Sequence, residues 1–145
     1  MSADDSAHRL VRALVERFPL FAPALAAQLK RDDGVLYPVL FMDGPVPREF
    51  MKLVMAGTPA ALADAASIAR FLEEHWVAGD NAVRDAINTS FLEGLPCSRE
   101  DQSRLEGLLG QNLAREYVAW NSTLGRPIHA RGFQRYVRRN PRRPE

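Results

Sequence analysis

The sequence predicts an all-α protein, a single compact bundle of about six to seven short helices. Apolar residues recur at three- and four-residue spacing along most of the chain, which is the pattern of amphipathic helices. Helix-capping residues alternate at short intervals with the Gly and Pro residues that end helices. The length of 145 residues suits one domain with a core of ordinary size.

Two helices are predicted near the N-terminus. Asp5 or Ser6 is expected to cap the first, whose apolar face ends near Phe18. The second follows Pro19 and stops at Gly34, because glycine is favoured just past a helix end. Its predicted inward residues are Leu20, Phe21, Leu25 and Leu29.

Residues 35–46, with the sequence VLYPVLFMDGPV, are the one stretch without a helical period. Their composition is consistent with a buried extended segment or a short strand. A lone strand would leave its backbone groups without partners, so we favour a proline-containing apolar connector that plugs the core. Pro47 suits the first position of the helix that follows.

Two longer helices are predicted in the middle of the chain. Thr58 and Pro59 open the first of them, as N-cap and first-turn proline, and Gly79 closes it. Asp80 or Asn81 caps the second. The predicted inward residues are Ala61, Ala65, Ile68, Leu72 and Trp76 in the first helix, and Val83, Ala86, Ile87, Phe91 and Leu95 in the second.

Two more helices are predicted before the C-terminus. Ser98 with Asp101 three residues later resembles a capping box, and this helix is expected to reach Gly110. The last helix spans about residues 111–124. One or two further turns are expected within residues 128–140.

Charge divides the chain into two parts. Residues 1–124, the predicted helical domain, hold 12 basic and 17 acidic residues, a net charge of −5. Residues 125–145 form a basic, Arg-rich and partly flexible C-terminal tail with seven arginines and one glutamate. An acidic body with a basic tail is therefore hidden behind the overall charge of +1.

The sequence holds no pattern typical of an enzyme, and we expect no catalysis, cofactor or metal. The adjacent Glu73, Glu74 and His75 lack the three- or four-residue spacing that puts metal ligands on one helix face. Cys97 follows a proline at a helix start, but no catalytic motif surrounds it. The glycines of residues 107–111 lack the lysine of a phosphate-binding loop.

Composition also predicts where in the cell the protein is located. No run of eighteen apolar residues is present, so no membrane association is expected. The N-terminus lacks the apolar segment of a signal peptide. A single cysteine fits a reducing compartment, and the cytoplasm is the expected location.

Several segments together resemble a known family. They are LVRALVERFPLFAPAL near the N-terminus, LYPVLFMD, then ARFLEEHWVAGDNAVRDAINTSFLEGL, and finally LEGLLGQNLAREYVAW. The chain resembles a family of small, uncharacterised all-helical bacterial proteins, often encoded near polymorphic or secreted toxins and regarded as candidate immunity proteins. The resemblance spans about residues 9–121, and the basic tail is an addition to the family's usual pattern.

The resemblance implies an immunity protein that neutralises a cognate toxin, encoded next to it, by stoichiometric binding. Many antibacterial toxins are basic, so an acidic surface would suit such a partner. The residues expected to contact it are Glu73, Glu74, Asp80, Asp85 and Glu93. For each of them, a solvent-exposed or helix-capping role is the alternative.

The alternative function is a small nucleic-acid-binding or regulatory adaptor that acts through the tail. Arginines interleaved with Phe133 and Tyr136 suit phosphate neutralisation and base stacking. The expected polyanion-binding residues are Arg131, Arg135, Arg138, Arg139, Arg142 and Arg143. The acidic body would oppose such binding, and the tail is equally suited to fold back on that body.

Overall fold

The structure, a computed structural model, describes residues 3–137 and is all-helical over them, as predicted. Its elements in chain order are α1 (Ala3–Arg17), η1 (Pro19–Phe21), α2 (Ala22–Arg31), α3 (Pro38–Asp43), α4 (Pro45–Ala56), α5 (Pro59–Ala78), α6 (Asn81–Ala86), η2 (Ile87–Leu92), α7 (Arg99–Leu105), α8 (Gln111–Thr123) and η3 (Arg131–Tyr136). The described part of the chain thus has eight α-helices, more than the six to seven expected.

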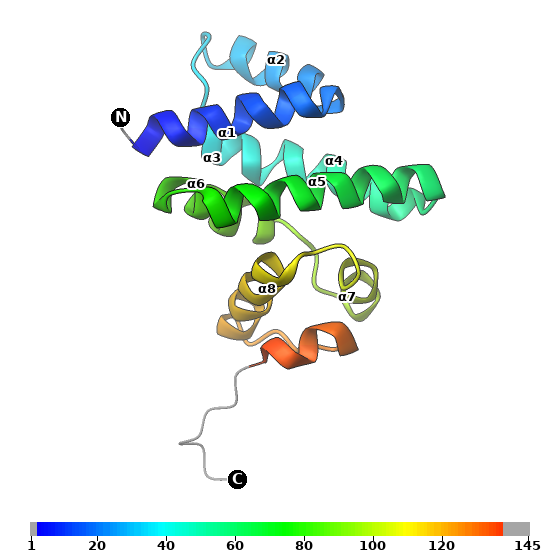
Figure 1. Cartoon of the computed structure of the whole chain (residues 1–145). Helices are drawn as coiled ribbons and strands as arrows, with labels where there is room; N and C mark the ends of the chain where they lie inside the picture. The colour runs from blue at the N-terminus through cyan, green and yellow to red at the C-terminus, as the bar shows by residue number, and fades with distance from the viewer. Residues whose placement is uncertain (1–2, 138–145) are drawn as a thin grey trace.

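The long helix α5 crosses the middle of the molecule and has elements packed on several sides (Figure 1). Helices α1 and α2 lie above it in this view, and α3 and α4 lie behind α1 and α5. Helices α7 and α8 lie below α5, with η3 at the lower end. Because α4 and α8 both pack on α5, this helix joins the upper and lower parts of the molecule.

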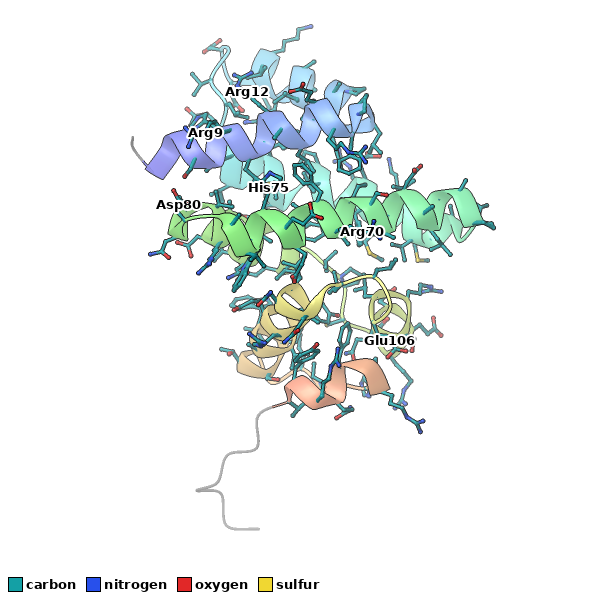
Figure 2. The ribbon with its side chains drawn as sticks, viewed as in Figure 1. Arg9, Arg12, Arg70, His75, Asp80 and Glu106 are labelled. Carbon is teal, nitrogen blue, oxygen red and sulfur yellow. The ribbon has the colours of Figure 1, made fainter. Side chains whose placement is uncertain are left out.

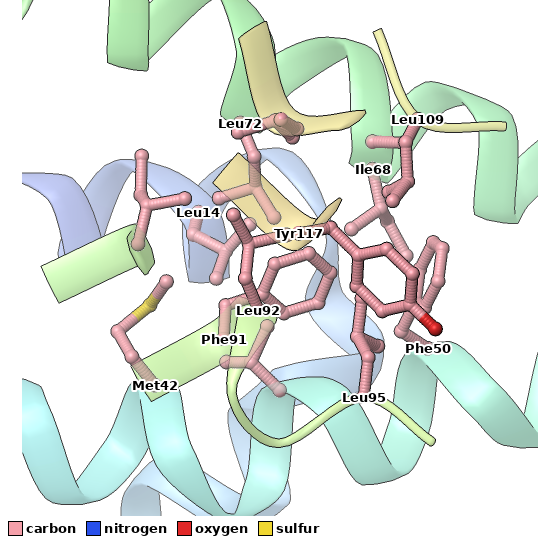
Figure 3. Close-up of a cluster of buried hydrophobic side chains, with 14 of the residues drawn as sticks. Leu14, Met42, Phe50, Ile68, Leu72, Phe91, Leu92, Leu95, Leu109 and Tyr117 are labelled. Atoms are coloured by element: carbon pink, nitrogen blue, oxygen red, sulfur yellow. The ribbon is translucent and has the colours of Figure 1, made fainter. Parts of the chain in front are cut away.

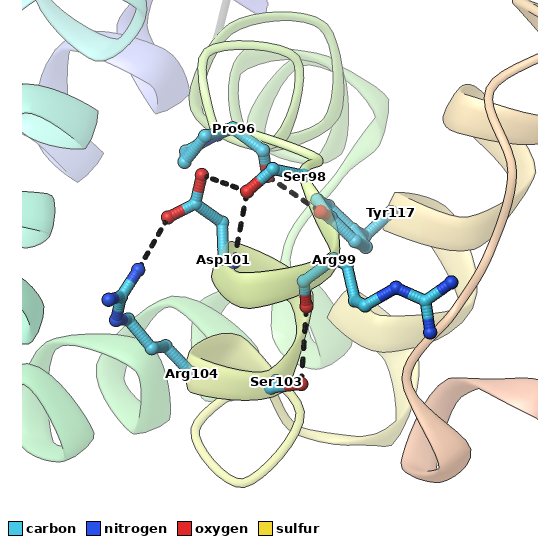
Figure 4. Close-up of polar contacts among 7 residues, drawn as sticks. All are labelled: Pro96, Ser98, Arg99, Asp101, Ser103, Arg104 and Tyr117. Atoms are coloured by element: carbon cyan, nitrogen blue, oxygen red, sulfur yellow. Dashed lines mark hydrogen bonds and ion pairs between the residues drawn. The ribbon is translucent and has the colours of Figure 1, made fainter.

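Short polar residues set the starts of three helices, as their sequence positions predict. The side chains of Thr58 and Asp80 accept hydrogen bonds from backbone N–H groups three residues ahead, at 3.1 and 3.0 Å. Ser98 accepts from the Asp101 amide at 3.1 Å and donates to the Asp101 carboxylate at 2.7 Å (Figure 4). Arg104 in turn donates to Asp101 at 3.1 Å.

Other predicted boundaries differ from the structure. Helix α1 already contains Asp5 and Ser6, the two residues expected to precede it. Helix α7 ends at Leu105 rather than near Gly110. Helix α2 ends at Arg31, and the predicted Gly34 lies in the turn that follows, where Asp33 and Gly34 have φ values of +54° and +82° and the Gly34 N–H donates to Leu29 O.

Helix α6 continues directly into η2, one turn and a half of π-helix. The wider turn buries Ile87, Ser90, Phe91 and Leu92 together, which one narrow face of an α-helix would not do. Apolar spacing alone does not separate this geometry from a regular α-helix. The inward residues predicted for 81–95 are nevertheless all buried.

Residues 38–43 form α3 and residues 45–46 begin α4, while residues 35–37 form an irregular link, so most of the predicted connector is helical. Pro38 and Pro45 occupy first-turn positions of α3 and α4, where proline does not interrupt hydrogen bonding. A helix of six residues is too short to show a period in the sequence. The predicted contribution of this segment to the core is confirmed for one face, since Phe41, Met42 and Val46 are fully buried.

The core runs continuously from α1 to η3. Residues from α1, α3, α4, α5, η2 and α8 converge in it, among them Leu14, Met42, Phe50, Leu72, Phe91 and Tyr117 (Figure 3). The buried Tyr117 hydroxyl donates to Pro96 O at 2.7 Å. Leu20, predicted inward, is 38% exposed because the 3-10 turn η1 directs Phe21 inward instead.

The folded domain continues beyond residue 124, where the sequence placed its end. Phe133 is fully buried and lies 5.2 Å from Tyr117, centroid to centroid. The Gln102 side chain donates to Pro127 O and accepts from the His129 and Ala130 amides. Residues 127–136 are therefore fixed to α7 and α8, and the one or two turns expected here are η3.

Candidate protein-binding site

Glu73, the first of the predicted contact residues, caps another helix. Its carboxylate accepts hydrogen bonds from the backbone N–H groups of Asn112 and Leu113 at 2.7 and 3.1 Å. Negative charge at this position complements the N-terminal end of the α8 dipole. A Cβ on Gly110 would lie 2.7 Å from the Glu73 side chain, so glycine is needed where the helix approaches.

Asp80 likewise has a structural role. It accepts from the Val83 amide at the start of α6 and from the Ser6 hydroxyl of α1, both at 3.0 Å. The hydrogen bond from Val83 and the one from Ser6 lower the pKa of Asp80 below its usual value. Asp80 therefore joins α1 to α6 as an ionised cap.

The other three acidic residues differ in exposure. Glu74 on α5 and Asp85 on α6 are exposed and form no ion pair within the described part of the chain. Glu93 is half-buried just after η2, and partial burial, together with the charge of Asp43, raises its pKa. Of the five, Glu74 and Asp85 are open to a partner.

Of the six arginines predicted to bind a polyanion, two are described. Arg131 and Arg135 are exposed on η3, and the Arg135 guanidinium lies 4.7 Å from the centre of the Tyr136 ring. Hydrogen bonds from the Ala130 and Gly132 amides to α7 and the residue after it fix the backbone beside Arg131, so η3 presents both arginines from a packed segment. The remaining predicted residues, Arg138, Arg139, Arg142 and Arg143, lie outside the described residues.

An exposed apolar surface, not predicted from the sequence, lies on and beside α3. Its members are Val35, Tyr37, Val39 and Leu40, which are 46–56% exposed. We call these four residues the α3 surface. A sequence signal exists, because eight consecutive residues from 35 to 42 are apolar or proline. A short helix buries only one side, so such a run must leave apolar side chains outside.

Two clefts share Gly44 and Arg48, and the first of them reaches the α3 surface at Leu40. The first, of about 330 Å³, lies between α2 and the α3–α4 junction and is lined also by Ala24, Ala27, Gln28, Arg31, Leu40 and Pro45. The second, of about 440 Å³, is lined also by Asp43, Pro47, Met51, Lys52, Met55, Gly94 and Pro96. Methionine side chains adapt readily to different apolar partners. The clefts extend the α3 surface across α4 as one candidate binding face.

A separate cleft of about 440 Å³ lies between α1 and the α5–α6 junction. Arg9, His75 and Asp80 are among its lining residues and are labelled in Figure 2. The His75 ring is stacked on Phe71 at 4.0 Å between centroids, and its Nδ1 lies 2.9 Å from Phe71 O. Both contacts hold His75 against its own helix, which is a packing role.

Within residues 3–137, no helix is long and apolar enough to cross a membrane. No group of three or more His, Cys, Asp or Glu side chains there is arranged to hold a metal ion. Cys97 is a half-buried free thiol that packs against the core.

The fold and this face define a small all-helical domain with a candidate surface for another protein. Residues 11–125 match the family model described as a domain of unknown function, DUF7674. The chain belongs to that family, which covers most of its length. No curated protein and no solved structure matches the chain.

Proposed function

We propose that this protein is an immunity protein, which binds a cognate bacterial toxin stoichiometrically and acts without catalysis. The observation that carries the proposal is the α3 surface together with its two clefts. Apolar side chains are half-exposed here in the free protein, and their removal from water by a partner lowers the free energy of the complex. A rigid helical face with adjoining pockets is the arrangement that a protein partner uses for its anchor residues.

Charge supports a protein partner as well. Glu74 and Asp85 present carboxylates outside the apolar face, where they would attract a basic protein over a distance comparable with the Debye length. Such charges mainly raise the association rate, whereas buried anchors set the lifetime of the complex. We therefore assign affinity to the α3 surface and attraction to the acidic residues.

The test is co-expression with the protein encoded next to this chain. The proposal expects that the neighbouring protein arrests growth alone, that co-expression restores growth, and that the two proteins elute as a 1:1 complex in size-exclusion chromatography. Full growth arrest despite a well-expressed partner, with two separate elution peaks, would overturn it. Rescue without a complex would replace binding with another mechanism.

The second candidate function is an adaptor that binds nucleic acid through its basic C-terminal residues. The observation in its favour is that η3 holds exposed Arg131 and Arg135 at one end of the molecule, beside Tyr136. Retention of the full chain on single-stranded DNA should then fall steeply with salt. The variant R131A/R135A should elute at lower salt, and equal elution of the two proteins would exclude this site.

A further inference from the structure

We infer that the cleft between α2 and the α3–α4 junction recognises the backbone of an extended partner segment carrying an apolar side chain next to a carboxylate. The inference deepens the proposed function, and it rests on that function only for the origin of the segment, which we assign to the toxin. Three features of the cleft carry it: an unpartnered buried amide, an apolar wall and two flanking arginines.

Gln28 is the first feature. Its side chain lines the cleft and is only 2% exposed, yet neither Oε1 nor Nε2 has a hydrogen-bond partner among the described residues. Burying an amide without partners costs free energy, so a polar side chain at such a position is unusual in a core-facing helix. The side-chain amide offers one acceptor and donors close together. A peptide group of an extended chain offers the complementary donor and acceptor.

The apolar wall is the second feature. Ala24 and Ala27 of α2 are small, and Leu40 and Pro45 face them across the cleft. Small residues on one side leave room for a partner's backbone in the cleft, and the Gln28 amide, which is inaccessible in the free protein, turns toward that backbone on binding. Leu40 is 56% exposed and connects the cleft to the α3 surface, so an apolar side chain beside the bound peptide group would remain in contact with it.

The two arginines are the third feature and fix the charge of the occupant. Arg31 and Arg48 line the cleft, and no carboxylate residue does. Each has a long ion pair with its neighbour in sequence, Arg31 to Asp32 at 3.8 Å and Arg48 to Glu49 at 3.6 Å. Exposed pairs of this length contribute little, whereas a carboxylate that reaches a guanidinium in the bidentate geometry binds well. The segment therefore carries Asp or Glu.

Charge also argues against two other occupants of the cleft, the chain's own C-terminal residues and a second copy of the chain. The chain's own residues 138–145 contain four arginines, so Arg31 and Arg48 would repel most of that segment. A second copy of the chain would place the same two arginines close to one another across a symmetric contact. A partner segment with a carboxylate has neither disadvantage.

The experiment is a selection of random twelve-residue peptides displayed on phage against the full chain, with Gln28→Met as the counter-selected protein. Methionine keeps the length and unbranched shape of glutamine but removes the amide. The selected peptides are then made with capped ends, and their affinities are measured by fluorescence polarisation. For the tightest peptide, each peptide nitrogen in turn is replaced by N-methyl to remove its donor.

We expect peptides with an apolar residue next to Asp or Glu, and binding to Gln28→Met weakened by at least about fivefold, the effect of leaving one buried group unpaired. N-methylation at one position of the peptide should weaken its binding to the wild type by a similar factor. The same N-methylated peptide should bind Gln28→Met as well as the unmodified peptide does. Because the variant removes an unsatisfied amide, its thermal midpoint should equal or exceed that of the wild type. A loss of binding therefore does not arise from unfolding.

Several results would overturn the inference. Selected peptides that bind both proteins equally, that are basic, or that tolerate N-methylation at every position would each do so. Self-association of the wild type that Gln28→Met abolishes would assign the cleft to a second copy. Tighter peptide binding after removal of residues 138–145 would assign it to the chain's own terminus.

The outcome is separable from that of the proposed function. If co-expression protects cells while the selected peptides bind the wild type and Gln28→Met equally, the immunity function stands and the cleft assignment fails. If the selection finds Gln28-dependent acidic peptides while co-expression gives no protection, the cleft stands and its partner is not a toxin.

Discussion

Several carboxylates in this protein organise helices. Glu73, Asp80 and Glu106 each accept a hydrogen bond from a backbone N–H, and Glu73 and Glu106 do so across more than 20 residues of sequence. The Asp101 carboxylate accepts from the Ser98 hydroxyl at the start of α7. The capping role of Glu73 leaves no local pattern, because the capped amides lie 39 and 40 residues further along the chain, whereas the cap of Asp80 could be predicted from its position before α6. At the scale of single residues, part of the acidic character of the body is therefore structural.

The capping role of Glu73 leads to a first prediction. Glu73→Ala should lower the free energy of unfolding by about 1–2 kcal/mol, because two amides at the start of α8 lose their acceptor. The measurement is urea denaturation at neutral pH. Glu74→Ala, at the exposed neighbouring position, is the matched control and should change stability by less than about 0.5 kcal/mol. Equal effects of the two substitutions would contradict the capping role.

Asp80 and Glu93 should give opposite pH dependences. The pKa of Asp80 lies below its usual 3.8, so folding favours the carboxylate, and its contribution is complete above that value and lost as the pH falls further. The pKa of Glu93 lies above its usual 4.5, so folding favours the protonated form, and stability declines as the pH rises from 4.5 through the raised pKa. Thermal midpoints between pH 2.5 and 7 test both (~0.5-unit steps suffice).

Two variants separate these contributions. Asp80→Asn should reduce the loss of stability below about pH 4, and Glu93→Gln should reduce the decline above about pH 4.5. Each variant serves as the other's control. Asp80→Asn should leave the decline of stability above about pH 4.5 unchanged, and Glu93→Gln should leave the loss below about pH 4 unchanged. Parallel curves for Asp80→Asn and the wild type below pH 4 would show that Asp80 is not stabilised by its hydrogen bonds.

Helix α3 shows at the scale of one element how a short helix serves packing and binding at once. Its two sides differ sharply, since Phe41 and Met42 are fully buried while Val39 and Leu40 are more than half exposed. Proline at the first turn and Gly44 at the end confine it to six residues. The buried side therefore fixes the position of the exposed side.

The two sides of α3 should respond differently to substitution. Phe41→Ala should cost about 3–5 kcal/mol of stability, because it leaves a cavity in the core. Leu40→Ser, on the adjacent exposed position, should cost less than about 1 kcal/mol. Chemical denaturation of both variants checks this. A Leu40→Ser cost approaching that of Phe41→Ala would mean that the α3 surface is part of the core.

The packing of η3 depends on one buried amide. Gln102 is fully buried and bonds Cys97 O, Pro127 O and the amides of His129 and Ala130. Gln102→Ala should therefore increase hydrogen exchange within residues 127–136, while the amides of α5 stay protected. Hydrogen–deuterium exchange with mass spectrometry measures this. Unchanged exchange in 127–136 would show that Phe133 and the Glu106–Gly132 hydrogen bond suffice to fix the segment.

At the scale of the whole molecule, the sequence predicted the helical class, most helix starts and most of the core. Caps and apolar spacing are local signals, so Thr58, Asp80 and Ser98 could be identified without a structure. The π-turn of η2, the helical form of α3 and the packing of η3 depend on tertiary contacts. The α3 surface could not be predicted for the same reason. A run of consecutive apolar residues does not indicate which of its side chains are exposed.

The binding claim rests on the α3 surface, and isothermal titration calorimetry of two charge variants against the neighbouring protein tests it most directly. Val39→Asp/Leu40→Asp should weaken binding at least about 100-fold, because two anchors become charged at the contact. Glu74→Lys/Asp85→Lys, at exposed positions outside that surface, should weaken it less than about tenfold and mainly through slower association. Thermal midpoints of both variants confirm folding. Binding unchanged by the α3 substitutions but abolished by the lysine substitutions would contradict the account.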